Sequence, residues 1–226
     1  MSYLLEKIEG IHYSLIQDLY KLSFNANHSV ATIIEKYDTS LFGLKNIGFF
    51  AKPIGGEPAA YYGVFPIQLQ YEGQTILIAQ SGDTMTAPNH QKKGLFVMLA
   101  SETYKLCKKT GIKLVYGFPN ENSYPGFKNK LNWVFNGNMK KLTFNVFTLP
   151  LCELASKFTL IKPAYNVFVK FTLSKFITEP TADIITSINY NEVKGQILKD
   201  DNYFNYKFRN KSIFLVLIHT STVYIT

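Results

Sequence analysis

The segment at residues 86–96 combines residue types that could bind an anion. Pro88 ends a predicted strand because it lacks a backbone N–H, and an apolar helical pattern begins a few residues later. Between them, Gln91 to Gly94 supply consecutive backbone N–H groups at a helix start, where donors lack partners and the helix dipole is positive. Gly94 has no Cβ and allows close approach to the backbone. This pattern predicts a site for an anion such as a pyrophosphate, although an ordinary helix start would look the same.

Positive charge is concentrated in the same part of the chain. The formal net charge is +8, and residues 92–141 contain ten lysines and two glutamates, which accounts for the whole excess. Lys92 and Lys93 could face phosphates, but a solvated lysine surface is the alternative. Arg209 is the only arginine, and arginine is the usual reader of guanine, so no nucleic-acid partner is expected.

The elements before this segment are two helices followed by a run of strands. Apolar residues at helical spacing predict helices at residues 11–22 and 30–37, the second capped by Ser29. Three β-rich runs follow, separated by turn signals at Gly55-Gly56 and at residues 71–74. They predict an antiparallel meander of strands at residues 47–51, 59–69 and 75–85.

The elements after it alternate between helix and strand. We expect a helix at 93–109, a strand at 112–118, a helix at 124–131 and a strand at 140–148. A weaker pattern gives a helix at 151–157, a strand at 165–173, a helix at 191–198 and an apolar, β-prone end at 213–226. The order predicts an α/β fold with a mixed, mostly antiparallel sheet flanked by helices, and a ligand site where the third strand meets its helix.

Two strings resemble motifs of the GNAT N-acetyltransferase superfamily. P-N-H-Q-K-K-G-L-F-V-M-L, at residues 88–99, resembles the family's acetyl-CoA-binding motif, (Q/R)-x-x-G-x-(G/A). N-E-N-S-Y-P-G-F-K-N-K-L-N-W, at residues 120–133, is similar to the family's Asn-rich turn and short helix. The wider pattern looks like a bacterial branch of hypothetical or polysaccharide-associated acetyltransferases. The resemblance implies a sheet with a V-shaped splay and acetyl-CoA, or another acyl-CoA, as cosubstrate.

The resemblance also implies roles for individual residues. Asp83 is the candidate base, although it could equally cap a bulge beside Gly82, and Tyr124 is the candidate acid for the departing thiolate. The candidate coenzyme-binding residues are Met85, Thr86, Gln91, Lys92, Lys93, Gly94, Leu95, Phe96, Asn120 and Asn122.

Three positions depart from the family pattern. Phe96 stands where many members have Gly or Ala, so its side chain is expected to point away from the ligand. Asn132 replaces the glycine before the closing aromatic residue, Trp133, which is a mild change because Asn tolerates the left-handed conformation. Lys128 stands where the family often has its catalytic tyrosine, and Tyr124, one helical turn earlier, could substitute.

The predicted function is N-acyl transfer from acyl-CoA to a primary amine of a small substrate, with an amino sugar as one candidate. The alternatives are a non-catalytic CoA-binding domain, a fragment of a Fem-like aminoacyl transferase and a lysine-rich nucleic-acid-binding module. Two cysteines cannot alone make a zinc site, so no metal is expected. The longest apolar stretch, residues 213–218, is far below the ~20 residues of a membrane span, so we expect a cytoplasmic protein with no membrane partner.

The motifs divide the chain into two predicted parts. Residues 1–148 would form the acyl-CoA-binding domain, and residues 149–226 an extension with a partial second sheet that lines the acceptor cleft. The apolar stretch at 213–218 would be an exposed strand edge unless something pairs with it. An internal strand or a second subunit, in a homodimer, is therefore expected to cover it.

Overall fold

The computed structural model describes residues 2–137, 157–158, 160–174, 177–178, 194–209, 214–218 and 221–225. The chain forms two compact units. The first comprises Met1–Gly137 and Tyr190–Tyr206, and the second Asn138–Asn189 and Lys207–Thr226. In the described part of the chain, no helix is both long and apolar enough to cross a membrane.

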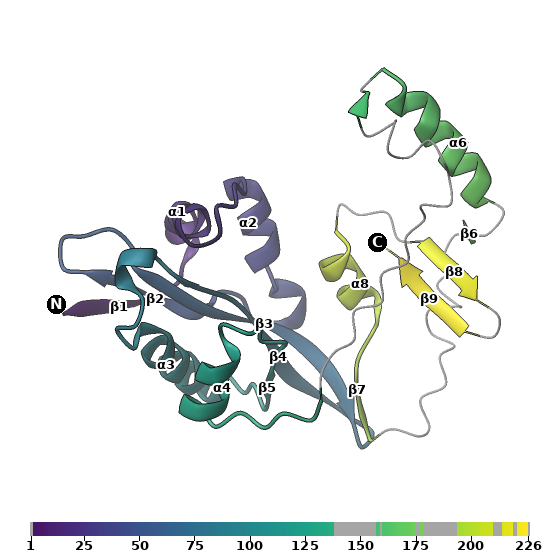
Figure 1. The fold of residues 1–226 in the computed structure, drawn as a ribbon. Coiled ribbons are helices and arrows are strands. Elements are labelled where there is room, and N and C mark those ends of the chain that lie inside the picture. Colours follow the sequence, from purple (N-terminus) through teal and green to yellow (C-terminus); the bar gives the residue numbers. More distant parts are fainter. Residues whose placement is uncertain are drawn as a thin grey trace. The chain divides into compact units, whose positions relative to one another are not determined.

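The first unit is built on a mixed, mostly antiparallel sheet, as predicted (Figure 1). Strand order is β1-β2-β3-β4-β5, with β7 paired to β3, and β4–β5 is the parallel pair among the described strands. The six strands described in this sheet are β1 (Tyr3–Lys7), β2 (Ile47–Pro53), β3 (Ala60–Tyr71), β4 (Gln74–Thr86), β5 (Val115–Tyr116) and β7 (Gly195–Ile197). The predicted meander corresponds to β2, β3 and β4, whereas β1 was not predicted.

Helices cover both faces of this sheet (Figure 1). One face carries α1 (Tyr13–Phe24) and α2 (Val30–Tyr37), and the other carries α3 (Leu95–Lys109) and α4 (Tyr124–Lys130). Short 3-10 turns occur at Gly10–His12, Ser40–Phe42 and Pro88–His90. All four helices were predicted to within a few residues, and Ser29 caps α2 by accepting a 3.1 Å hydrogen bond from the Thr32 N–H.

A hydrophobic core lies on each face. Tyr62, Leu95 and Leu99 are buried on the α3 side, and Ile16, Ile33 and Tyr61 are buried on the α1–α2 side. The central strands are therefore apolar on both faces, as is usual when helices cover a sheet on two sides.

A transverse row of glycines makes room for two aromatic rings on the α1–α2 face. Gly48, Gly63 and Gly82 are register partners across β2, β3 and β4. A Cβ on Gly63 would lie 2.0 Å from the Tyr61 hydroxyl oxygen, and one on Gly82 would lie 2.8 Å from the Phe65 ring. The two rings can therefore lie close to the sheet only because these positions have no side chain.

A bulge in β4 changes which face its residues present. Tyr61 pairs with Met85 and Gly63 pairs with Gly82, so Asp83 and Thr84 together stand opposite the single residue Tyr62. Asp83 has a left-handed φ of 56°, which Asp tolerates better than most residues. The sequence analysis gave a position at a bulge as the alternative role for Asp83, and this bulge is present.

β5 leaves β4 almost at once, which is the V-shaped splay that the resemblance implies. In the described chain the two strands pair at Ala79–Val115 and Gln80–Tyr116, although β4 continues to Thr86. The strand predicted at 112–118 is correspondingly shorter. Among the described residues, no strand pairs with residues 81–86 of β4 on the β5 side.

The predicted helix at 191–198 is wrong, because this segment contains the strand β7. Ile197 pairs with Leu69 of β3 and packs beside the core residues Ile67 and Ile78. Gly195 disfavours a helix, and a Cβ there would meet the Tyr71 ring at 2.8 Å. Helix α8 (Asp201–Lys207) follows, and its Tyr206 hydroxyl donates a 2.9 Å hydrogen bond to the Lys36 carbonyl oxygen of α2.

The second unit contains a helix where a strand was predicted. Residues 165–173 belong to α6 (Lys162–Ser174), so that prediction is wrong. A short apolar run does not distinguish helix from strand, and Pro163 in the first turn favours the helix. A separate sheet of three described strands has the order β6 (Ile177–Thr178), β8 (Phe214–Ile218), β9 (Ser221–Ile225).

Both neighbours of β8 lie within the chain. β6 pairs with Leu215 and Val216 on one side, and β9 pairs with Phe214–Ile218 on the other. A homodimer through this strand and the lining of an acceptor cleft by this unit stay predictions. The strand predicted at 140–148 lies outside the described residues, as does all of the helix predicted at 151–157 except Lys157.

The glycine row gives a testable prediction about stability. Gly63→Ala should lower the free energy of unfolding by about 1–3 kcal/mol, because the added methyl displaces the buried Tyr61 ring from a packed core. Urea unfolding measures this change. Gly10→Ala is the matched control, since its Cβ would meet nothing closer than 3.9 Å. Equal stability of the two variants would contradict the packing argument.

Candidate active site

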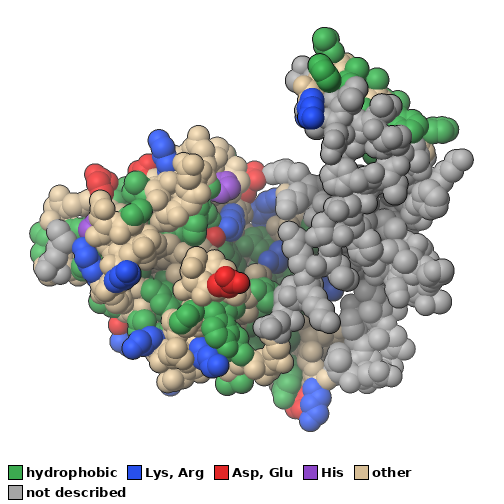
Figure 2. Space-filling view, in the orientation of Figure 1, with side chains coloured by type: hydrophobic (Ala, Val, Ile, Leu, Met, Phe, Trp, Pro, Cys, Tyr) green, Lys and Arg blue, Asp and Glu red, His purple; other side chains and the backbone are tan. Residues whose placement is uncertain are grey.

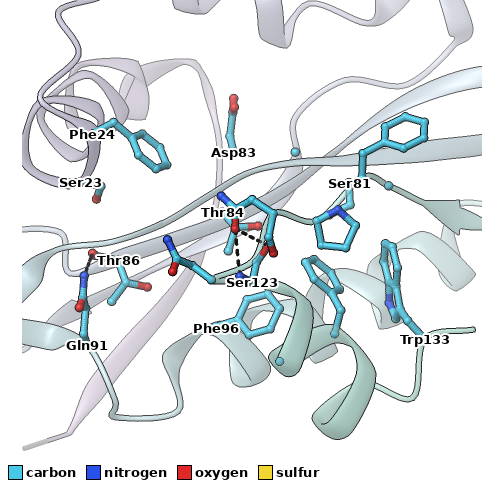
Figure 3. Close-up of a pocket in the computed structure, with 18 of the residues that line it drawn as sticks. Ser23, Phe24, Ser81, Asp83, Thr84, Thr86, Gln91, Phe96, Ser123 and Trp133 are labelled. Carbon is cyan, nitrogen blue, oxygen red and sulfur yellow. Dashed lines mark hydrogen bonds between the residues drawn. The ribbon is translucent and has the colours of Figure 1, made fainter. Parts of the chain in front are cut away.

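A cavity of about 910 Å³ opens where β4 and β5 separate. One wall is β4 from Ser81 to Thr86, and the opposite wall is the turn after β5 together with α4. Gln91, Lys92 and Phe96 bound one end, at the loop before α3. Figure 3 shows Asp83 and Phe24 on one side of β4, and Phe96 and Trp133 on the other.

The loop before α3 has the backbone geometry of an anion site. Lys92 has φ of 60° and Gly94, which caps the helix, has φ of 76°, so two of four consecutive residues are left-handed. A Cβ built on Gly94 would find nothing within 4 Å, so its backbone faces open space. Left-handed residues next to the first turn of a helix are an arrangement in which backbone N–H groups can converge on an anion.

Seven of the twelve predicted site residues line this cavity. They are Asp83, Thr86, Gln91, Lys92, Phe96, Asn120 and Asn122. Met85, Lys93, Gly94, Leu95 and Tyr124 are not among the described residues that line it.

The residues outside the lining have other contacts. Met85 is 1% exposed and packs in the core on the α1–α2 side, while Leu95 is 2% exposed in the opposite core. Lys93 donates a 2.9 Å hydrogen bond to the Asn89 carbonyl oxygen and lines a separate hollow with Tyr3. Any contact of Gly94 or Leu95 with a ligand here would therefore use the backbone.

Tyr124 packs against neighbouring side chains at the start of α4. Its ring centroid is 4.4 Å from that of Phe135, and the Lys128 Nζ lies 5.5 Å from the ring centroid on a cation–π contact. Lys128, at the position where the family often has its catalytic tyrosine, thus contacts the ring of Tyr124, the tyrosine that could substitute.

Asn120 shapes the turn that precedes α4. Its Oδ1 accepts hydrogen bonds from the Ser123 N–H and hydroxyl, both at 3.0 Å (Figure 3). The Asn120 carbonyl oxygen also accepts from the Tyr124 N–H at 2.9 Å. The Asn-rich segment therefore fixes the wall of the cavity that faces β4.

Asp83 forms an ion pair that the sequence did not indicate. Lys36 Nζ of α2 lies 2.6 Å from Asp83 Oδ1 and 2.9 Å from the Tyr20 hydroxyl. The Asp83 side chain is 10% exposed and the Lys36 side chain 45%, so the pair is reached by solvent from the lysine side. Lys36 Nζ also lies 5.4 Å from the Tyr20 ring centroid and 5.5 Å from that of Phe65.

Three tyrosines around this ion pair remain protonated at ordinary pH. Burial raises the pKa of the Tyr20, Tyr37 and Tyr61 hydroxyls well above the usual value, and the negative charge of Asp83 raises them further. The surroundings of Asp83 are thus neutral phenols and one ammonium group.

The bulge places Ser81 and Asp83 on opposite faces. In a regular strand, residues two apart share a face. Here Ser81 contacts Tyr62 in the α3-side core, whereas Asp83 contacts Lys36 on the α1–α2 side. Sequence reasoning missed both Ser81 and Lys36. The polar residues Ser81 to Thr84 within an otherwise apolar strand could have indicated Ser81. No pattern near Lys36 in the sequence indicated its contact with Asp83.

Aromatic side chains fill the angle between the two strands. The Phe96 ring packs edge to face on Phe127, at 4.9 Å between centroids, and a Cβ on Gly126 would lie 2.6 Å from it. Trp133 lies 4.3 Å from Phe127 between centroids and covers Gly117 in the same way. Phe96 therefore belongs to the cavity wall and is held on its α4 side.

Charged groups are dispersed on the one face of the molecule that Figure 2 shows. On the face shown in Figure 2, lysine side chains stand singly among neutral and acidic ones. Among the described residues, no group of three or more His, Cys, Asp or Glu side chains is placed to hold a metal ion.

Several solved structures that resemble this chain are acetyltransferases by title. An acetyltransferase from Trypanosoma brucei is 16% identical, with a TM-score of 0.51 over 63% of this chain and 100% of that chain. Glucosamine-6-phosphate N-acetyltransferase from Arabidopsis thaliana is 13% identical, with a TM-score of 0.49 over 64% of this chain and 100% of its own. No curated protein sequence matches this chain.

The family comparison covers the part of the chain that builds the sheet and the cavity. The acetyltransferase (GNAT) domain family matches residues 8–135, more than half of the sequence. This range includes the splayed strands, the loop before α3 and the Asn-rich turn. The chain belongs to the GNAT acetyltransferase family.

Proposed function

We propose that this protein transfers an acetyl or other short acyl group from acyl-CoA to a primary amine of a small substrate. The observation that supports this best is the cavity that extends from the part of β4 beyond its described pairing with β5 to the loop before α3. A long cosubstrate with phosphates at one end and a reactive carbonyl at the other suits such a site. An acyl-CoA donor also implies a cytoplasmic location.

The residues of the loop fit the phosphates of a coenzyme. The space in front of Gly94 is open, and Lys92 brings a positive charge to the cavity wall. Phe96 replaces a smaller residue of the family pattern, but its ring is held against Gly126 and its N–H remains in the first turn of α3. We therefore assign phosphate binding to the backbone of Gln91 to Phe96 with Lys92.

The edge of β4 can bind the amide groups of the pantetheine arm. The Leu77 carbonyl oxygen and the Ala79 N–H already bond to residues 113 and 114 on the β5 side. Backbone groups beyond Gln80 point the same way where β5 has departed, so an extended amide chain can pair with them as an added strand. Thr86 lies on this route toward the loop.

Asp83 is the proposed base on the acceptor side. An amine that attacks the thioester carbonyl forms a C–N bond and must lose a proton, while the C–S bond breaks. The Asp83 carboxylate borders the cavity on the face with α1 and α2, and Lys36 compensates its charge there. An acceptor ammonium group that approaches Asp83 would partly replace Lys36 as the positive partner of the carboxylate, and it would then lose its proton to Asp83.

Acceptors are proposed as small amines, and amino sugars are one class to include. No nucleic-acid or membrane partner forms part of the proposal. The direct test is calorimetry and thermal unfolding with acetyl-CoA, followed by thiol release with a panel of primary amines. Coenzyme binding without thiol release for any amine would favour the non-catalytic alternative, and absence of binding would contradict the proposal.

The loop yields a prediction about coenzyme binding. Gly94→Val should abolish the rise in melting temperature with acetyl-CoA, because a β-branched residue is strained at φ of 76° and its side chain fills the space before the donors. Thermal unfolding with and without acetyl-CoA measures this. The variant's own unfolding transition must remain cooperative for the test to count, and a normal shift in it would exclude this loop as the phosphate site.

The two neighbouring lysines form a matched pair. Lys92→Ala should weaken CoA binding about two- to fivefold, corresponding to about 0.5–1 kcal/mol, because Lys92 borders the cavity. Lys93→Ala should have a smaller effect, since Lys93 bonds to the Asn89 carbonyl oxygen. Calorimetry at low and high salt compares them. Equal losses in both variants would show that only general positive charge matters.

The assignment of Asp83 predicts a loss of turnover. Asp83→Asn should lower kcat about 100-fold with little change in CoA affinity, because the amide keeps the size of the side chain and cannot take a proton. Asp18→Asn, on the exposed side of α1, is the control for the same chemical change. Unchanged kcat in Asp83→Asn would limit Asp83 to the bulge and its ion pair.

A further inference from the structure

Four side chains form a hydrogen-bonded chain beneath the cavity. The Trp133 Nε1–H donates to the Tyr104 hydroxyl at 3.0 Å, that hydroxyl lies 2.9 Å from the Tyr62 hydroxyl, and the Tyr62 hydroxyl lies 2.8 Å from Ser81 Oγ. Trp133 and Ser81, the two ends, both line the cavity. Tyr62 is fully buried between them.

The direction of this chain follows from its first member. An indole N–H only donates, so the Tyr104 oxygen accepts, and the single Tyr104 proton must find another acceptor. The acceptor that the described residues offer is the Tyr62 hydroxyl. In this order of donors the Tyr62 hydroxyl donates to Ser81 Oγ, and the Ser81 proton is left to point into the cavity.

Both tyrosines keep their protons. Burial raises the pKa of the Tyr62 and Tyr104 hydroxyls above the usual value. Each phenol therefore contributes one proton and the order of donors does not reverse by ionisation at ordinary pH. In the reversed order the Tyr104 proton has no acceptor among the described side chains, whereas the order from Trp133 to Ser81 gives the proton of each phenol a side-chain acceptor.

Ser81 stands at a particular point of the cavity. It is the first β4 residue beyond the last pair with β5, and a Cβ on Gly117 across the gap would lie 3.2 Å from Ser81 Cβ. The phosphate-binding loop proposed above lies beyond the other end of the same β4 segment. A coenzyme anchored at that loop carries its sulfur at the far end of the pantetheine arm, toward Ser81.

We propose that the Ser81 hydroxyl is the hydrogen-bond donor that stabilises the thiolate leaving group, with Trp133, Tyr104 and Tyr62 as positioning residues that orient its proton. This inference rests on the proposed function, because it assumes that CoA occupies the cavity. It assigns to β4 a role that the resemblance would place on α4, where Lys128 stands.

The step requires no proton transfer from serine. As the amine forms its C–N bond, the C–S bond breaks and the electron pair leaves on sulfur. A thiolate is a much weaker base than a serine alkoxide, so Ser81 donates a hydrogen bond and keeps its proton. The amine proton goes to the base on the opposite face, and the thiolate takes its proton from water after release.

The test measures the pKa of the thiol of enzyme-bound CoA, which needs no acceptor substrate. Ultraviolet absorbance of the thiolate is followed against pH, with the same enzyme bound to desulfo-CoA subtracted as a blank. A donor to the thiolate lowers this pKa, so Ser81→Ala should raise it by about one unit. Ser101→Ala is the matched control, because its hydroxyl bonds to the Val97 carbonyl oxygen within α3.

Two further variants decide between alternatives. Trp133→Phe keeps an aromatic ring beside Phe127 but removes the donor that orders the chain, so it should raise the thiol pKa in the same direction as Ser81→Ala. Tyr124→Phe should leave it unchanged. A thiol pKa that moves with Tyr124→Phe and not with Ser81→Ala would overturn the proposal in favour of Tyr124.

The outcomes separate this inference from the proposed function. Calorimetry on each variant first establishes that CoA is bound. If CoA binds and Ser81→Ala titrates like the wild type, the role of Ser81 is wrong while the acyltransferase proposal stands. If the wild type binds no CoA, the proposed function fails and this inference fails with it.

Discussion

The separation of β5 from β4 is the constraint on which the rest of the site depends. If β5 paired with β4 as far as Thr86, its backbone would form hydrogen bonds with the backbone groups of residues 81–86. In the described part of the chain the pairing stops at Gln80–Tyr116, so no described strand takes up those groups, and a cavity opens beside them. Where the chain leaves β4 after β5, it enters the Asn-rich turn. The separation of the two strands therefore produces both the cavity and the cavity wall that faces β4.

Rigid side chains must occupy the space between β4 and β5 if the two strands are to stay apart. Phe96, Phe127 and Trp133 fill this space, and each outer ring rests on a glycine, Gly126 under Phe96 and Gly117 under Trp133. Large rigid rings on positions without a Cβ fix the spacing more tightly than flexible aliphatic side chains would. On the other face, Tyr61 and Phe65 use Gly63 and Gly82 in the same manner.

The bulge at Asp83 then divides the chemistry between the two faces of the sheet. Without it, Ser81 and Asp83 would point the same way. With it, the carboxylate lies among α1, α2 and three neutral tyrosines, while the Ser81 hydroxyl ends a hydrogen-bonded chain on the α3–α4 side. Groups that remove a proton from an attacking amine and groups that stabilise a leaving thiolate can thus act from opposite sides of one carbonyl. A single left-handed residue in one strand produces this division.

The sequence by itself determined the local elements and the order in which they follow. Apolar periodicity predicted α1 to α4, turn residues predicted the meander, and Pro88 and Gly94 predicted the loop at the start of α3. These signals depend on residues close together in the chain, where propensity and turn chemistry act directly. The predictions of a helix at 191–198 and a strand at 165–173 were wrong because a short apolar segment does not by itself distinguish helix from strand.

Only the tertiary structure decided which groups meet. Lys36 reaches Asp83 across 47 residues, and Trp133, Tyr104, Tyr62 and Ser81 come from four different segments of the chain. The face that Asp83 presents depends on one extra residue in a strand register, which no local pattern encodes. Contacts of this kind are fixed by the packing of the two cores and by the glycines that permit it, so they become visible only when the sheet and its helices are assembled.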